Sequence, residues 1–150
     1  MQLDDTAKIL ADAEFFDLCD AEQRRLLAFA AERRKYRPGT VLYASGDIPD
    51  GAHVLISGTV TSIQDDSPDT PQLTNRPGSL IGMVSLVIDK PRHITVKAVD
   101  SVETVLVPRG AFMKLARQSP DLAARAAQRF RAEMVGYLDV IETFRGRIQK

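Results

Sequence analysis

The spacing of apolar residues divides the chain into a helical beginning, a strand-rich middle and a helical end. In the first part, apolar positions recur at helical spacing over residues 9–18 and again over residues 26–31. Asp20 separates the two runs and is the residue type that favours a helix N-cap, with Gln23 three positions later. The pattern therefore predicts two short helices within residues 6–35.

The middle of the chain, residues 36–108, consists of short β-rich runs between turn residues. The first turn is Pro38-Gly39, and the residues that follow it are mostly β-branched or aromatic. Short strands that are separated by Gly, Pro and Asp at this spacing are typical of a sandwich, a jelly roll or a small barrel. This region is therefore expected to form one of these three β folds.

Two features stand out inside the roll. The runs His53–Ile56 and Thr59–Ile63 flank the turn Ser57-Gly58, which predicts a β-hairpin. The polar run Gln64–Gln72 contains two consecutive aspartates and two prolines. This run is expected to be a solvated loop between strands.

Helical spacing returns after Pro108. Residues 109–118 predict one helix, and Ser119-Pro120-Asp121 supplies an N-cap, a first-turn proline and an acidic residue for a second, long helix. The whole chain, residues 1–150, is thus expected to be one α+β domain. Its strand-rich middle would be flanked by the N-terminal helices and by C-terminal helices over residues 109–148.

The last predicted helix carries an apolar stripe with the spacing of a coiled coil. Steps of four, three, four, three and four residues separate its members, which are Phe130, Met134, Tyr137, Ile141, Phe144 and Ile148. A heptad seam of this kind favours contact between two helices, so it predicts a homodimer. The alternative is that the stripe packs against the chain's own barrel.

Composition and charge exclude several classes of protein. The chain has 150 residues, 44% of them hydrophobic and 27% charged, which is typical of an ordinary globular domain. Twenty basic residues balance twenty acidic ones, so direct DNA binding is not expected. The N-terminus lacks the features of a secretory signal, and no apolar run is long enough to span a membrane. With a single cysteine, the chain is expected to be cytoplasmic.

The residues needed for common catalytic or metal sites are missing. His53 and His93 are the only histidines, which are too few for a three-histidine metal site. Nucleophile-elbow and phosphate-loop motifs do not occur. Cys19 lies in an apolar helical context and is read as a core thiol. We therefore expect neither an enzyme nor a bound cofactor or metal, and a cupin-like metalloenzyme is only a weak alternative.

Residues 77–98 resemble the phosphate-binding cassette of cyclic-nucleotide-binding domains, the family of the catabolite activator protein and of protein kinase A regulatory subunits. In that family, the cassette reads approximately Phe-Gly-Glu-Leu-Ala-Leu, four variable positions, then Pro-Arg-Ala/Ser-Ala-Thr-Val. This chain matches it at the positions Gly82, Leu86, Pro91-Arg92 and Thr95-Val96. The likeness extends over roughly residues 10–135 and, with the order of the turn signals, implies an α+β fold with an antiparallel β-roll (jelly roll) over residues 36–108.

The cassette also has a physical logic. A glycine before a short helix lets successive backbone N–H groups face an anion, and an arginine adds a fork of donors for phosphate oxygens. The resemblance implies a ligand site at Gly82, Met83, Val84, Ser85, Arg92, His93 and Thr95.

Two positions depart from the family pattern. Met83 replaces the glutamate that accepts hydrogen bonds from the ribose 2′-hydroxyl, and His93 replaces a small residue beside the phosphate. Ribose recognition is therefore expected to be poor, and cAMP binding weak.

The favoured function is a stand-alone regulatory sensor that binds cAMP, cGMP or another phosphate-bearing ligand and signals to a protein partner. The alternative is an interaction or scaffold domain that has lost nucleotide binding. Since the sequence ends at Lys150, no helix-turn-helix domain is expected to follow the roll.

Overall fold

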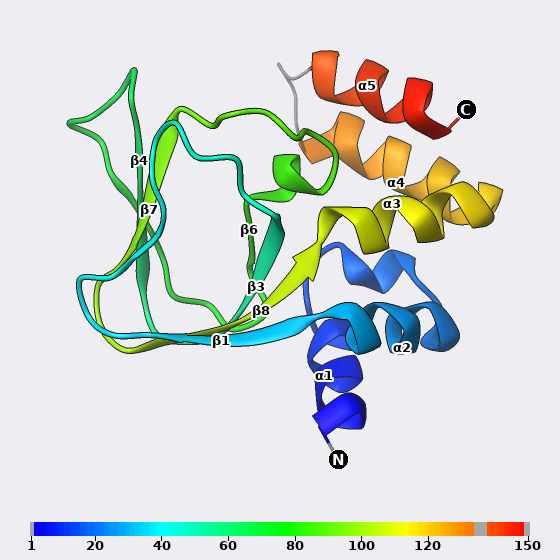
Figure 1. Cartoon of the computed structure of the whole chain (residues 1–150), viewed down its shortest axis with the longest axis horizontal. Helices are drawn as coiled ribbons and strands as arrows, with labels where there is room; N and C mark the ends of the chain where they lie inside the picture. Colours follow the sequence, from blue (N-terminus) through cyan, green and yellow to red (C-terminus); the bar gives the residue numbers. More distant parts are fainter. Residues whose placement is uncertain (1, 134–137, 149–150) are drawn as a thin grey trace.

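A computed structural model describes residues 2–133 and 138–148, and it confirms the α+β fold with an antiparallel roll (Figure 1). The helical elements are α1 (Gln2–Ala11), η1 (Phe16–Leu18), α2 (Ala21–Ala30), η2 (Met83–Leu86), α3 (Arg109–Gln118), α4 (Pro120–Glu133) and α5 (Leu138–Ile148). The strands are β1 (Glu32–Tyr36), β2 (Val41–Tyr43), β3 (Gly51–Ser57), β4 (Val60–Gln64), β5 (Gln72–Thr74), β6 (Leu80–Ile81), β7 (Ile94–Ala98) and β8 (Val102–Pro108).

The strands form two four-stranded sheets, with the orders β1-β8-β3-β6 and β2-β7-β4-β5. The predicted hairpin is wrong, because β3 and β4 belong to different sheets and the turn between them carries the chain across. Gly58 in this turn has a φ of 95°, and a Cβ there would lie 2.3 Å from the carbonyl oxygen of Ser101. A local pattern shows that two strands are joined by a turn, but their partners, β8 and β7, are supplied by distant segments.

Strands β3 and β8 are buried on both faces of their sheet. Val105 and Val107 of β8 pack into the helical core, whereas Val102 lies inside the roll with Leu55 of β3. The helices α1–α5 gather on the outer side of this sheet (Figure 1). This double burial explains why β3 and β8 read as nearly continuous apolar runs instead of alternating ones.

The roll begins earlier than the sequence pattern indicated. Residues 32–35, which we assigned to the end of a helical region, form β1 together with Tyr36, and the strand pairs with β8 in antiparallel register from Glu32↔Leu106 to Tyr36↔Val102. The segment is rich in charge, and its side chains are exposed or half-buried. Such an edge strand is stabilised by its backbone hydrogen bonds to the neighbouring strand, so its own amino-acid composition does not indicate a strand clearly.

The C-terminal region is not one long helix. A continuous helix would separate Phe130 and Phe144 by about 20 Å, yet their ring centroids are 5.1 Å apart. The chain therefore reverses between α4 and α5, and α5 lies alongside α4 (Figure 1).

This reversal corrects the expected coiled-coil seam. Phe130, Ile141 and Phe144 are buried in the chain's own helical core, and Ile148 is partly buried against it. The seam positions Met134 and Tyr137 lie outside the described residues. Regular apolar spacing of this kind fits either a dimer seam or packing within the chain. Here it serves the packing of α5 on α3 and α4, in which the ring of Phe144 contacts that of Phe112 of α3.

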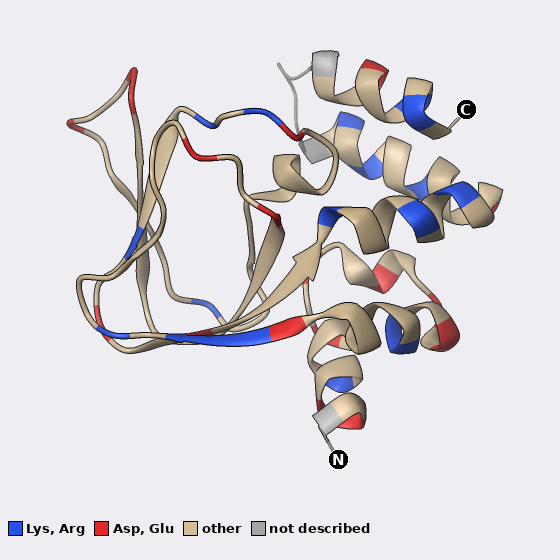
Figure 2. Ribbon diagram, in the orientation of Figure 1, with Lys and Arg blue, Asp and Glu red and all other residues tan. Residues whose placement is uncertain are grey.

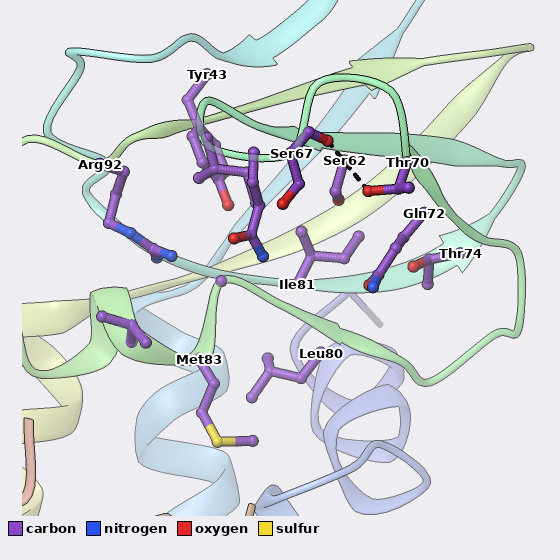
Figure 3. A pocket seen from close by; sticks show the side chains of 14 residues that line it. Tyr43, Ser62, Ser67, Thr70, Gln72, Thr74, Leu80, Ile81, Met83 and Arg92 are labelled. Atoms are coloured by element: carbon purple, nitrogen blue, oxygen red, sulfur yellow. Dashed lines mark hydrogen bonds between the residues drawn. The ribbon is translucent and has the colours of Figure 1, made fainter. Parts of the chain in front are cut away.

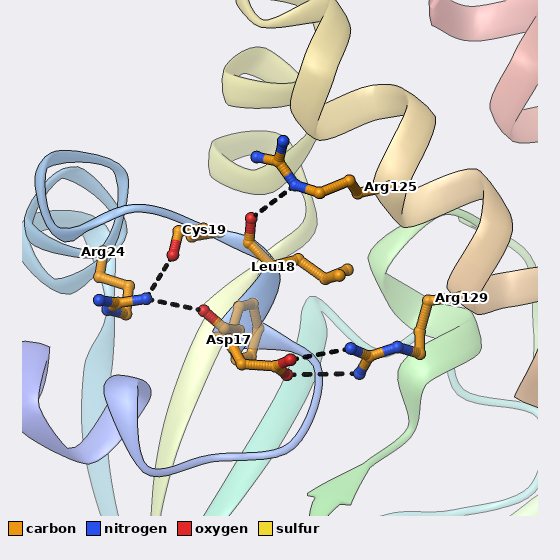
Figure 4. A network of polar contacts seen from close by, with 7 residues as sticks. Asp17, Leu18, Cys19, Arg24, Arg125 and Arg129 are labelled. Atoms are coloured by element: carbon orange, nitrogen blue, oxygen red, sulfur yellow. Dashed lines mark hydrogen bonds and ion pairs between the residues drawn. The ribbon is translucent and has the colours of Figure 1, made fainter.

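Polar contacts join the N-terminal turn η1 to α4 (Figure 4). Asp17 accepts two hydrogen bonds from Arg129, at 3.3 and 2.8 Å, and these bonds hold the pKa of its carboxyl below the ordinary value. Arg125 donates to the carbonyl oxygen of Leu18 at 3.1 Å. Cys19 is 4% exposed, and burial raises its thiol pKa to about 11. The interpretation of Cys19 as a core thiol is confirmed.

Candidate functional site

A cavity of about 360 Å³ lies between η2 and the strands β4 and β5 (Figure 3). Its volume falls within the range of small-molecule sites in proteins. Hydroxyl and amide side chains make up half of the described lining, which consists of Tyr43, Ser62, Gln64, Ser67, Thr70, Gln72, Thr74, Leu80, Ile81, Gly82, Met83, Val84, Arg92 and Ile94.

The backbone at Gly82 makes the turn expected of a phosphate cassette. Its φ of 79° and ψ of 40° are left-handed, which favours glycine. The next residues form η2, and the Ser85 N–H closes its first turn on the carbonyl oxygen of Gly82 at 2.8 Å. The N–H groups of Met83 and Val84 find no backbone acceptor within the described residues. They are free to donate to a ligand anion.

Arg92 directs its guanidinium into the cavity (Figure 3). Its Nη1 is buried and has no hydrogen-bond partner within residues 2–133 and 138–148. The backbone of Arg92 is fixed to the turn after β2, where it donates to Asp47 at 3.0 Å and accepts from Gly46 at 2.8 Å. A buried cationic nitrogen without a partner is costly, so this arrangement fits an anionic ligand.

Four of the seven residues expected at the site line the cavity: Gly82, Met83, Val84 and Arg92. The other three do not. Thr95 uses its hydroxyl to accept a hydrogen bond from the Ser45 backbone at 3.0 Å, so it fixes the end of β2. Ser85 and His93 also lie outside the lining.

Ser85 is fully buried behind the Gly82 turn, and its hydroxyl has no partner within the described part of the chain. His93 has a side chain that is 84% exposed and lies 3.9 Å from Asp65. The bulk of His93 is therefore turned outward, whereas Ile94, which follows it, lines the cavity.

Met83 contributes to the wall of the cavity, but its side chain points away from Arg92, toward the side on which Leu80 lies (Figure 3). Both side chains pack partly against the helical core. None of the described lining residues is acidic. The cavity thus offers one cation and several neutral polar groups, without a carboxylate acceptor for a ribose hydroxyl.

Sequence reasoning missed the polar wall formed by β4, β5 and the segment between them. Ser62 and Gln64 follow Val60 at two-residue spacing, and Val60 faces the roll interior. A strand face that changes from apolar to polar along its length was the available signal. The run read as a solvated loop also supplies Ser67 and Thr70 to the cavity.

Two arginines outside the cavity hold η2 and the residues after it in place. Arg109 Nη1 lies 2.8 Å from the carbonyl oxygen of Pro49, and 3.1 Å from those of Ser85 and Ile88. Arg147 of α5 donates to the Val87 carbonyl at 2.6 Å and to Asp89 at 2.8 Å. The cassette is therefore anchored to both α3 and α5.

His53 lies inside the roll next to the cavity wall. It is 3% exposed, its Nδ1 is 3.1 Å from the Thr104 hydroxyl, and its ring stacks on Tyr43 at an interplanar angle of 20°. Burial lowers the histidine pKa to about 4, with a smaller contribution from the charge of Arg34. The folded protein therefore holds His53 neutral at neutral pH.

Acidification is expected to destabilise the fold through His53. The unfolded state binds more protons between the ordinary pKa of 6.5 and the folded value of about 4, so stability falls as pH drops through this window. Between pH 7.5 and pH 5, the loss should be about 2 kcal/mol by urea denaturation. His53→Gln should remove most of this pH dependence, and the exposed-site control His93→Gln should keep it. Equal pH slopes for wild type and His53→Gln would contradict the prediction.

Charges of both signs are interspersed over the helices and loops (Figure 2). Within the described residues, no group of three or more His, Cys, Asp or Glu side chains is arranged to hold a metal ion. None of the helices traced in residues 2–133 and 138–148 is both long enough and apolar enough to cross a bilayer.

Comparisons with known proteins find similarity to cyclic nucleotide-binding domains. The sequence model of the cyclic nucleotide-binding domain matches residues 33–119, which is more than half of the chain. The chain is 28% identical to a cyclic nucleotide-binding-like protein of known structure from Brucella abortus, with a TM-score of 0.61 over 74% of this chain and 97% of that one. The regulatory domain of Toxoplasma gondii PKA, solved with cAMP, has a TM-score of 0.69 at 20% identity over 85% of this chain and 50% of that one.

Curated relatives include much longer proteins. The chain is 26% identical over 120 residues to patatin-like phospholipase domain-containing protein 6 of Homo sapiens. The match covers 79% of this chain but only 9% of that protein. The likeness therefore concerns one part of the relative and not its full length.

Proposed function

This chain belongs to the cyclic nucleotide-binding domain family, and from that membership we propose that it is a regulatory sensor module for a phosphate-bearing ligand. The observation that carries the proposal is the buried, unpartnered Nη1 of Arg92 at a cavity beside the left-handed turn of Gly82. A phosphate in front of Gly82 would meet the charge of Arg92 and the N–H groups of Met83 and Val84.

In this proposal, the other expected site residues do not contact the ligand. Ser85 supports the Gly82 turn from behind, and Thr95 fixes the strand end next to Arg92. His93 lies at the exposed rim. Ligand contact is thus assigned to the backbone of residues 82–84 and to the Arg92 guanidinium.

The lining also bears on the ligand class. A cyclic nucleotide such as cAMP or cGMP carries the required phosphate, and the hydroxyls and amides of β4 and β5 can donate and accept hydrogen bonds with a base. Because the described lining has no carboxylate, the ribose 2′-hydroxyl should contribute little. We therefore infer that the site tolerates phosphate-bearing ligands that lack this hydroxyl.

Calorimetric titration of the purified protein with cAMP, cGMP and 2′-deoxy-cAMP tests the function. Saturable binding of at least one of the three is expected, with cAMP and 2′-deoxy-cAMP equal within a few-fold. Arg92→Ala should weaken that binding by about 10- to 100-fold, since it removes a charge-assisted hydrogen bond.

The matched control is Arg76→Ala, which removes an exposed arginine that does not line the cavity. It should bind like the wild type. Equal affinities of Arg92→Ala and Arg76→Ala would contradict the assignment of Arg92.

A second candidate function is a protein-interaction domain without a nucleotide ligand. The observation that favours it is the side chain of Met83, which stands at the family's acidic position and points away from Arg92. A folded wild-type protein that takes up none of the three nucleotides would support this candidate and reject the sensor function.

Regulation without catalysis, a cytoplasmic location and signalling to a protein partner are further parts of the proposal. A homodimer also remains a prediction, but the described seam residues Phe130, Ile141 and Phe144 are occupied within the chain. A dimer would therefore use another surface. The activities of the longer relatives concern chains of which this one spans a small part.

A further inference from the structure

We infer that the Tyr43 hydroxyl donates a hydrogen bond to the ligand phosphate and so forms, with Arg92 and the Gly82 turn, a three-sided anion site. This inference rests on the proposed function and adds a side chain that neither the cassette pattern nor the comparisons assign. Tyr43 ends β2, about forty residues before the cassette in the sequence. It reaches the site only through the pairing of β2 with β7.

The first observation is the position of the hydroxyl. A Cβ placed on Gly82 would lie 3.0 Å from Tyr43 Oη, so this oxygen lies directly over the turn. Figure 3 shows the Tyr43 hydroxyl and the Arg92 guanidinium extending toward the same part of the cavity. The fixed backbone explains this convergence, because Arg92 is hydrogen-bonded to the Gly46–Asp47 turn that follows Tyr43.

The second observation is that the hydroxyl is unused. Tyr43 is 6% exposed, its Oη makes no hydrogen bond to the described residues, and the residue lines the cavity. A hydroxyl at a cavity wall can donate to a ligand in place of water. Burial raises the pKa of this phenol above its ordinary value, so the oxygen keeps its proton and can donate it at neutral pH.

The third observation is that the ring is held rigidly. It stacks on His53, whose Nδ1 lies 3.1 Å from the Thr104 hydroxyl. The ring also packs among the apolar residues of the roll interior, including Leu55 and Val96. A donor fixed in this way loses little rotamer freedom when a ligand binds, which makes its hydrogen bond effective.

Tyr43→Phe removes the hydroxyl and keeps the ring, so it isolates the proposed hydrogen bond. Each protein is titrated with cAMP and, separately, with inorganic phosphate, while the amide signals of residues 82–84 are followed by NMR. Tyr43→Phe should weaken the binding of both probes by about tenfold, because both carry the phosphate. Its thermal midpoint without ligand should match that of the wild type.

The matched control is Tyr36→Phe, which removes a tyrosine hydroxyl that does not line this cavity. It should leave both affinities unchanged. Wild-type affinity in Tyr43→Phe, together with a loss in Arg92→Ala, would overturn the inference and leave the proposed function standing. A loss for cAMP alone would place the hydroxyl on another part of the ligand and reject the phosphate assignment.

Two further outcomes are decisive. If Tyr43→Phe unfolds without ligand, the hydroxyl serves the fold and the inference is wrong. If neither probe binds the wild type, the proposed function fails, and the Tyr43 assignment fails with it.

Discussion

Phe144→Ala is expected to lower the free energy of unfolding by about 3–5 kcal/mol. The ring is 1% exposed, and its centroid lies 5.1 Å from that of Phe130 and 6.3 Å from that of Phe112. Alanine would leave a cavity where three helices meet, and it would remove the contacts that hold α5 on the helical layer. Urea denaturation followed by circular dichroism measures the change.

Phe29→Ala is the matched control, because the side chain of Phe29 is 83% exposed. Its effect should stay within about 0.5 kcal/mol. A cost below about 1 kcal/mol for Phe144→Ala would mean that α5 does not pack on the core in solution. That result would again favour a homodimer formed through the apolar stripe.

Arg109→Ala is expected to destabilise the fold by about 3 kcal/mol and to loosen the cassette. The Arg109 guanidinium donates to the carbonyl oxygen of Ser85 within η2, to that of Ile88 just after η2, and to that of Pro49. Truncation would leave these acceptors without their charged donor, so η2 would lose its link to α3. Urea denaturation gives the change in stability, and nucleotide titration reports the effect on the site.

Lys114→Ala serves as the control on the same helix, since Lys114 is exposed. It should change neither stability nor binding. Arg109→Lys restores the charge as a single point donor and should recover part of the stability. If Arg109→Ala were as stable as Lys114→Ala, the three carbonyls would have other partners and the anchoring of η2 would need another explanation.

These two positions act on the same segment from opposite ends. Arg109 anchors η2 to α3, while α5, held by Phe144, contributes Arg147 to the residues just after η2. The Arg147 hydrogen bond holds the pKa of Asp89 below its ordinary value. Changes in α5 are therefore expected to reach the ligand site through a short set of direct contacts.

The sequence by itself determined the fold class and the centre of the site. Turn residues and β-branched runs were enough to place a strand-rich middle, because strand formation and turn chemistry are encoded locally. The roll itself and the site at Gly82 and Arg92 were identified from the resemblance to the phosphate-binding cassette, whose glycine and arginine stand close together in the chain. The Asp20 capping box at the start of α2 was likewise readable from four residues.

Only the tertiary structure decided which of several equivalent local patterns was used. The turn at Gly58 has the spacing of a hairpin, but pairing with β8 and β7 sends its two strands into different sheets. The stripe at Phe130 and Phe144 suits a dimer seam or an intrachain core equally well, and the reversal of the chain selects the core. Tyr43 gave no local sign of a site, because its position over Gly82 depends on strand pairing between distant segments. Burial and pairing are properties of the whole chain, and no window of sequence contains them.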